Sequence, residues 1–231
     1  MHKKFVLITI AVAVLTAGVY LYFALRRPAS KRTAQVFAWF QNPASLPDLM
    51  MEPATRCGEA PFIFPTHGLI GFIWDDYFNR HRHQGIDIFG GADIGVTPVS
   101  AAYPGYLTRL ADWKSSVIVR VPDDPLHPGR QIWVYYTHMA DPNGNSFISS
   151  EFPPGTRERY VEAGTLLGYQ GDYSGDPNNP TGVHLHVSIV KDDGSGHFKN
   201  ELDINNTYDP SPYFGLLLNA NENPDVIPVC R

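Results

Sequence analysis

The sequence VHLHVSIV at residues 183–190 decides the fold class of this 231-residue chain. Apolar and polar side chains alternate along it, which is the pattern of a β-strand rather than a helix. In an extended strand Leu185, Val187 and Ile189 share one face, and we expect that face to pack into a core. Two histidines share the other face, so the pattern predicts a half-buried strand with a polar outer side.

Two further stretches, residues 116–121 and 131–137, are rich in Val, Ile, Tyr and Trp and are predicted to be strands. Gly and Pro clusters separate the predicted strands, and no long amphipathic helix alternates with them. This arrangement disfavours a parallel sheet with crossover helices and predicts a mainly β domain with an antiparallel sheet. The long polar segments 122–130, 141–159 and 172–180 are expected to be surface loops that border a substrate groove.

Residues 5–25 carry no charged side chain and are predominantly apolar. A helix of this length spans about 30 Å, the thickness of the hydrocarbon core of a bilayer. The stretch is longer than the apolar core of a signal peptide, and no small-residue cleavage site lies near its end, so we predict a transmembrane anchor in preference to a cleaved signal peptide. Basic residues flank it on both sides, so charge alone does not orient it.

The charge distribution also bears on partners. The first 32 residues hold basic side chains and no acidic one, although the whole chain has a net charge of −5. The rest of the chain is therefore more acidic than the overall charge indicates. A surface of that sign repels a phosphate backbone, so we expect no nucleic-acid partner.

The chain has two cysteines, Cys57 and Cys230. In an oxidising compartment they would be able to form a disulfide that joins the end of the chain to the start of the domain, and two unpaired thiols are the alternative. Neither cysteine belongs to a closely spaced ligand pair, so we do not expect them to bind zinc.

Among the histidines, His83 stands out because it begins the segment HQGID, which ends at Asp87. If this segment is extended, the two side chains share a face, and Gly85 between them leaves the space open. His81 is a rival, since it forms an H-x-H pair with His83, but the glycine and aspartate that follow favour His83. We interpret three other histidines as ordinary surface or loop residues: His67, His127 and His197.

Three more histidines lie on or just after predicted strands, namely His138 and the pair His184 and His186. Two imidazoles and one carboxylate are a common ligand set for catalytic zinc. His83, Asp87 and one histidine of the pair 184/186 would supply it. Bound Zn²⁺ lowers the pKa of its water to about 7, which makes a nucleophile at neutral pH. The histidines that are not ligands are then the candidates for managing protons.

Six short motifs occur in an order that resembles the lysostaphin/LytM-type zinc endopeptidases, which cut peptidoglycan peptides. The motifs are HQGIDI at 83–88, TPVSA at 97–101 followed by Gly105, YTHM at 136–139, VEAGTLLGYQG at 161–171, TGVHLH at 181–186, and Asp209 with Pro210. The resemblance covers residues 62–214.

The resemblance implies a mostly antiparallel β-domain with a groove that leads to one zinc ion and takes short glycine-rich or D-amino-acid peptides. It implies metal ligands at His83, Asp87 and His186. It also implies that His138 and His184 assist as proton carrier and transition-state stabiliser.

The sequence departs from the family pattern at several places. Ser188 stands where the family frequently has a glutamate that is not a ligand, so we expect little effect on the metal. The segments 122–130 and 141–159 are long for the family, and 176–180 stretches the glycine segment before the TGVHLH motif. Because these loops would border the groove, we do not assign the family's substrate preference to this chain.

The motifs and the apolar segment together predict a membrane-anchored zinc endopeptidase that hydrolyses peptide crosslinks of peptidoglycan by attack of zinc-activated water. The expected organisation is a cytoplasmic N-terminus at 1–4, a transmembrane anchor at 5–25, a linker at 26–60, the zinc peptidase domain at 61–215 and a C-terminal tail at 216–231. The substrate places the domain on the extracytoplasmic side, in the periplasm or cell wall.

Two alternatives belong to other classes. A catalytically silent regulator that activates other cell-wall hydrolases is disfavoured because all five polar positions of the implied site are present. A peptidase aimed at secreted proteins or at another cell's wall is disfavoured by the anchor, since a tethered enzyme works near its own membrane.

Overall fold

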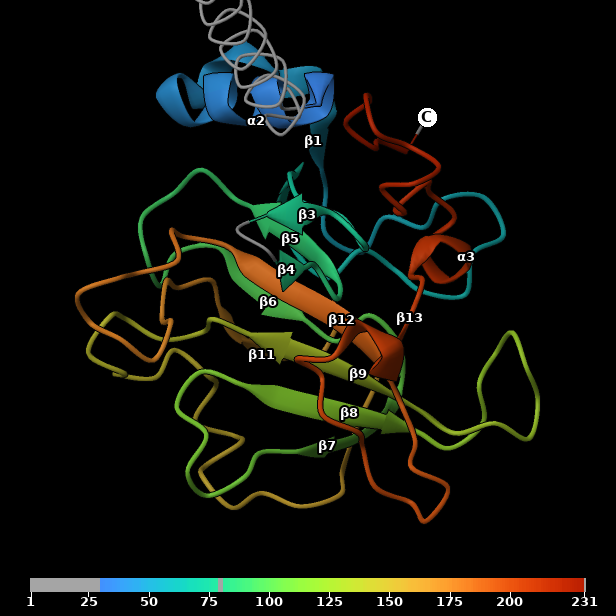
Figure 1. Cartoon of the computed structure of the whole chain (residues 1–231). Coiled ribbons are helices and arrows are strands. Elements are labelled where there is room, and N and C mark those ends of the chain that lie inside the picture. Colours follow the sequence, from blue (N-terminus) through green and yellow to red (C-terminus); the bar gives the residue numbers. More distant parts are fainter. Residues whose placement is uncertain (1–29, 79–80, 231) are drawn as a thin grey trace, which may run out of the picture. The chain divides into compact units, whose positions relative to one another are not determined.

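The three predicted strands lie side by side in one antiparallel sheet (Figure 1). They are β8 (Val117–Val121), β9 (Ile132–Thr137) and β12 (Leu185–Lys191), and each begins close to the residue that the sequence predicted. β9 pairs with β8 on one side and with β12 on the other. The prediction of a mainly β fold with antiparallel strands is confirmed.

The structure, a computed structural model, describes residues 30–78 and 81–230. The chain divides into two units, Met1–Ser30 and Lys31–Arg231, and the sheet belongs to the second unit. The predicted anchor at residues 5–25 lies outside the described residues. Within the described ranges, no helix combines the length and the hydropathy needed to cross a bilayer.

The main sheet extends beyond these strands in both directions, and every pairing in it is antiparallel. Its order is β1 (Met50–Met51), β2 (Gly68–Ile70), β5 (Ile86–Phe89), β12, β9, β8, β7 (Gly105–Thr108) and β10 (Arg159–Val161), with β13 (Thr207–Tyr208) also paired to β12. Two small sheets pair β6 (Pro98–Ser100) with β11 (Leu166–Tyr169) and β3 (Tyr77–Phe78) with β4 (His81–Arg82).

The main core lies on the apolar face of β12. Leu185, Val187 and Ile189 are all buried, as their alternation predicted, and they belong to one cluster with Val99 of β6 and Leu167 of β11. The small β6–β11 sheet therefore packs against the main sheet and closes this side of the core.

The opposite face of β12 is buried as well, which differs from the predicted half-buried strand. His184, His186 and Ser188 are only 4%, 6% and 0% exposed. The reason is that the segment at 192–203, which follows β12, folds back over this face, where Phe198 packs against Trp133 in a second apolar cluster. A strand that is buried on both faces still alternates between apolar and polar residues when the side chains that pack on one face differ in kind from those on the other.

The segment that was expected to be a linker contains regular structure from Lys31 onward. Helix α2 (Lys31–Gln41) buries Arg32, Val36 and Trp39, which lie on one helical face. Two single turns follow it, η1 (Pro43–Ser45) and η2 (Pro47–Leu49). At the other end of the unit, η3 (Ile204–Asn206) precedes β13, and α3 (Ser211–Phe214) follows it.

Cys57 and Cys230 form a disulfide with 5.4 Å between their Cα atoms. It joins the described C-terminal segment to the stretch that precedes β2. Of the two alternatives left open by the sequence, the structure has the disulfide.

Candidate metal centre and groove

Two of the predicted ligands are placed by strand register. Asp87 on β5 lies directly opposite His186 on β12 in the antiparallel ladder. Side chains at opposite positions of such a ladder are about 5 Å apart at their Cβ atoms, close enough to share one ion. Here Asp87 Oδ1 is 2.8 Å from His186 Nδ1.

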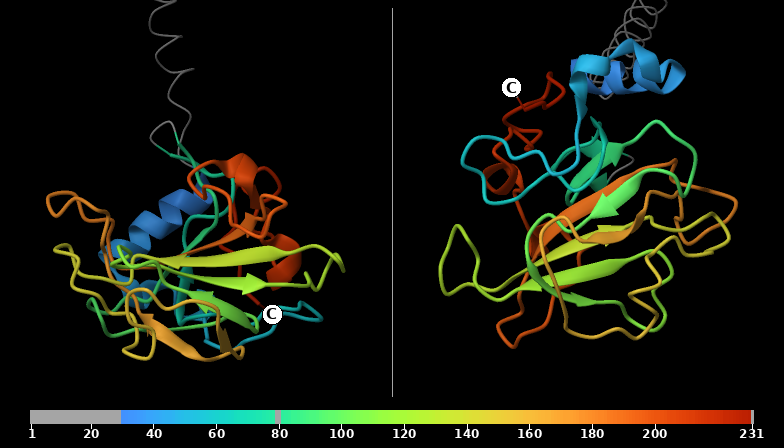
Figure 2. Two further views of the ribbon diagram at one scale, coloured as in Figure 1. Left: turned by 90° about the horizontal axis from the view of Figure 1, so that it is seen from below. Right: turned by 180° about the vertical axis from the view of Figure 1, so that it is seen from behind.

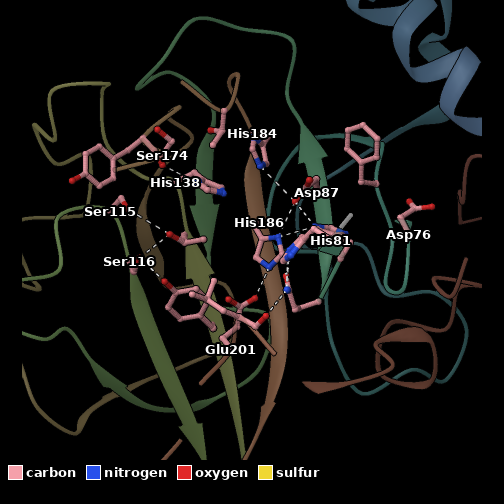
Figure 3. Close-up of a pocket in the computed structure, with 18 residues that line it drawn as sticks. Asp76, His81, Asp87, Ser115, Ser116, His138, Ser174, His184, His186 and Glu201 are labelled. Atoms are coloured by element: carbon pink, nitrogen blue, oxygen red, sulfur yellow. Dashed lines mark hydrogen bonds and ion pairs between the residues drawn. The ribbon is translucent and has the colours of Figure 1, made fainter. Parts of the chain in front are cut away.

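The third predicted ligand comes from the turn between β4 and β5. His83 Nε2 lies 3.0 Å from Asp87 Oδ1 and 3.0 Å from His186 Nδ1. Asp87 and His186 are labelled in Figure 3. The three residues offer ligand atoms that all lie within 4.8 Å of one another. Two imidazole nitrogens and one carboxylate oxygen at one point form a donor set that suits zinc, so these residues fit the ion that the sequence implied.

Gly85 makes this convergence possible. A Cβ at this position would lie 2.1 Å from the carbonyl oxygen of Val187 and 3.0 Å from Nε2 of His186. Any larger residue would push β5 away from β12 and separate the ligands. The sequence assigned the glycine to the space between His83 and Asp87, and the structure shows that the close neighbour is the backbone of β12.

Each ligand ring is oriented by its second nitrogen. His83 Nδ1 donates to the carbonyl of Ile73 at 3.0 Å, which leaves Nε2 as the ligand atom. His186 Nε2 donates to Glu201 Oε1 at 2.9 Å, which leaves Nδ1 as the ligand atom. Such outer contacts fix the tautomer and the plane of a metal-binding histidine.

His138 and His184, the two histidines predicted to assist, stand next to each other, with 4.5 Å between their ring centroids. His184 Nδ1 donates to the carbonyl of Gly182 at 2.8 Å, and His138 Nδ1 donates to the carbonyl of Tyr173 at 2.7 Å. Both rings therefore present Nε2 to the groove. His138 follows the last residue of β9 with a left-handed backbone (φ 72°), so the alternation of the strand ends before it.

Burial and neighbouring charges shift the pKa values of several groups in the site. Burial opposes ionisation of Asp87, but the neighbouring rings of His83, His184 and His186 hold its pKa well below the usual value. Burial and the two adjacent histidines lower the pKa of His138 to about 3, so its ring is neutral at pH 7. A neutral ring whose Nδ1 is occupied has a lone pair on Nε2 and can accept a proton.

The carboxylate of Glu201 interacts with this group of ionisable side chains through His186. Burial opposes its ionisation, but the hydrogen bond and the charge of His186 lower its pKa. In turn, burial opposes the charge on His186, and the carboxylates of Asp87 and Glu201 raise the pKa of His186 to about 10.

All five predicted residues line one groove with a volume of about 550 Å³. Its wall beyond the metal site is formed by hydroxyl groups: Tyr135 donates to Ser116 Oγ at 2.8 Å, and Ser116 is 2.7 Å from Thr137 Oγ1. Hydroxyl groups both donate and accept, so this wall is suited to the N–H and C=O groups of an extended peptide. The groove predicted from the sequence is present.

The loop expectations are confirmed only in part. Residues 173, 174 and 181 line the groove, whereas no described residue of 122–130 or 141–159 does so. Figure 2 shows the reason for the first of these, because the loop at 122–130 projects from the end of the sheet opposite to the loop at 172–183. It is held there by Asp124, which accepts hydrogen bonds from Arg130 and Tyr213.

The other histidines take no part in the convergent set. His81, the rival candidate, lines the groove and bonds to Gln84, while His83 belongs to the convergent set. His67, His127 and His197 do not line the groove. Glu201 was not predicted from the sequence, because it sits in a polar segment with no periodicity and no local signal marks it.

Comparisons with solved structures match this chain to several proteins, among them the following three. The catalytic domain of the antimicrobial peptidase lysostaphin from Staphylococcus simulans is 19% identical, with 64% of this chain and 89% of that chain covered and a TM-score of 0.39. A mutant catalytic domain of the prophage-encoded M23 protein EnpA from Enterococcus faecalis is 22% identical, with 64% and 95% covered and a TM-score of 0.39. A putative glycyl-glycine endopeptidase LytM from Ruminococcus gnavus is 23% identical, with 63% and 49% covered and a TM-score of 0.36.

No protein-family model matches the sequence, and no curated protein matches it significantly. Two of the matched structures are described as lysostaphin and LytM, the two names of the family that the sequence motifs resemble.

Proposed function

We propose that this protein is a zinc endopeptidase that hydrolyses peptide crosslinks of peptidoglycan. The observation that carries the proposal is the convergence of His83, Asp87 and His186 on one point at the floor of a peptide-sized groove. Two further histidines stand beside that point. The motif order in the sequence supports the substrate class.

In this proposal His83 Nε2, Asp87 Oδ1 and His186 Nδ1 hold the ion. When bound, Zn²⁺ supplies Lewis acidity, which polarises a peptide carbonyl and activates water. The groove positions the peptide against this point, and the hydroxyl groups of Ser116 and Tyr135 offer hydrogen bonds to its backbone.

His138 and His184 manage protons and charge. Their Nδ1 atoms are committed to carbonyl oxygens, so proton exchange with water or with the leaving amine takes place at Nε2. The neutral state of His138 suits the first proton acceptance. Once protonated, a ring of this pair stabilises negative charge that develops on the carbonyl oxygen.

The proposal also places the enzyme at a membrane, on its outer side. Residues 5–25 would anchor it, which rests on their hydropathy and length. The location of the peptidoglycan substrate supports the extracytoplasmic side.

The test is digestion of purified peptidoglycan by the full chain, with mass spectrometry of the released fragments. The proposal predicts new amino and carboxyl termini within the crosslinking peptides, and complete inhibition by a zinc chelator. Intact crosslinks after digestion, from protein that holds zinc, would instead support the silent regulator.

A further inference from the structure

The four histidine rings of the site are each oriented through one nitrogen, but the acceptors differ in kind. Three rings donate to main-chain carbonyls, those of Ile73, Gly182 and Tyr173. Among these four, only His186 donates to a carboxylate, Glu201 Oε1 at 2.9 Å. A carboxylate acceptor polarises an N–H more strongly than a neutral carbonyl does, so this contact differs in strength as well as in origin.

Glu201 reaches the ring from outside the sheet. It lies in the turn that leads into η3, and its side chain is only 14% exposed. Its neighbours in the chain are fixed on both sides: Gln84 Nε2 donates to the carbonyl of Leu202, and Asn206 Nδ2 donates to the carbonyl of Asn200, both at 2.9 Å. The backbone on both sides of Glu201 is therefore held by contacts that do not involve His186.

We propose that Glu201 is a positioning residue of the metal centre, which orients His186 and strengthens its bond to the ion. With Nε2–H committed to Glu201, Nδ1 is the atom that would exchange its proton for the ion, and it faces Asp87 at 2.8 Å and His83 at 3.0 Å. Partial proton sharing with the carboxylate raises the electron density of the ring and makes Nδ1 a better ligand. This inference rests on the proposed zinc site.

The experiment measures the zinc affinity of the full-length Glu201→Gln variant by competition with a chromophoric chelator. Gln keeps the size of the side chain and an acceptor oxygen but removes the charge. The expected result is zinc binding weaker by about 10- to 100-fold, the usual effect of losing such a partner. Glu59→Gln is the matched control, because Glu59 is exposed and lies outside the groove, and its affinity should equal that of the wild type.

Two additional measurements separate positioning from folding. The thermal midpoint of Glu201→Gln in the presence of excess chelator should stay close to that of the wild type under the same conditions. If Glu201→Gln does not fold, Glu201→Asp replaces it, since Asp keeps the charge but is one methylene shorter and should also bind zinc more weakly.

The outcomes distinguish the two proposals. Equal zinc affinity in folded Glu201→Gln and wild type overturns the role of Glu201 and leaves the zinc site intact. Failure of the wild type itself to bind zinc overturns the proposed function, and the role of Glu201 with it.

Discussion

Asp87 and His186 are directly opposite each other on two neighbouring antiparallel strands, and His83 reaches the same point from the turn before β5. The ladder between β5 and β12 thus fixes two ligands through backbone hydrogen bonds rather than through flexible side chains. A site built on strands in this way is preorganised, and changes to its ligands should affect metal binding without unfolding the domain.

His83→Ala should abolish zinc binding and hydrolysis, because it leaves only one imidazole and one carboxylate. Equilibrium dialysis with zinc, followed by metal analysis, measures this. His81→Ala is the matched control, since His81 is the neighbouring histidine of the same H-x-H pair and bonds to Gln84 instead of the ligand set. Loss of zinc in His81→Ala together with retention in His83→Ala would reverse the assignment.

His184→Ala should keep zinc but lower kcat by about 10²- to 10⁴-fold, the range expected for a lost general acid or base. The ring lies beside the ligand set, with Nε2 at 3.5 Å from Asp87 Oδ1, yet its Nδ1 is committed to Gly182. His138→Ala should behave in the same way. Steady-state hydrolysis of a soluble crosslinked peptide provides the rate, and an unchanged kcat in both variants contradicts the assigned roles.

Gly85→Ala should damage the site although it removes no ligand. The added methyl group would meet the carbonyl oxygen of Val187 at 2.1 Å, so β5 must move relative to β12. Overpacking of this kind costs about 1–3 kcal/mol of folding free energy. Denaturant unfolding and zinc titration together test this, and wild-type values in both would mean that the two strands separate more easily than their ladder indicates.

The double substitution Cys57→Ser/Cys230→Ser should lower the free energy of unfolding by about 2–5 kcal/mol, because the disulfide closes a long loop of the unfolded chain. Zinc affinity should stay unchanged, since neither cysteine lines the groove. Reducing the wild-type protein should produce the same loss. An equal denaturation midpoint with and without reductant would contradict a stabilising role for the bond.

The strands could be predicted from the sequence because their signals are local, whereas the choice of the five polar residues also drew on the resemblance of the motifs to a known family. Alternation over 183–190 marks one strand and the face that carries His184 and His186. The spacing of His83 and Asp87 around a glycine marks the second segment that contributes side chains to the site. Each of these patterns spans only a few residues, so the relative placement of its side chains follows directly from the period of the backbone.

Long-range contacts could not be predicted in this way. Glu201 comes to His186 because the segment after β12 folds back over the sheet, and nothing in its polar sequence specifies where it lands. The same fold-back buries Ser188, which alternation alone assigned to a half-exposed face. Helix α2 lies in the segment that was expected to be a linker, and nothing in its sequence predicted that Arg32 is buried with a hydrogen bond to the carbonyl of Gly71.

The proposed function depends above all on the binding of one zinc ion where His83, Asp87 and His186 meet. Native mass spectrometry of the purified full-length protein, before and after addition of a chelator, measures this binding directly. We expect one zinc per chain in the wild type and none in the triple variant His83→Ala/Asp87→Ala/His186→Ala. A wild type without bound zinc after zinc loading, or a triple variant that retains one ion, would show that the site is not the one proposed.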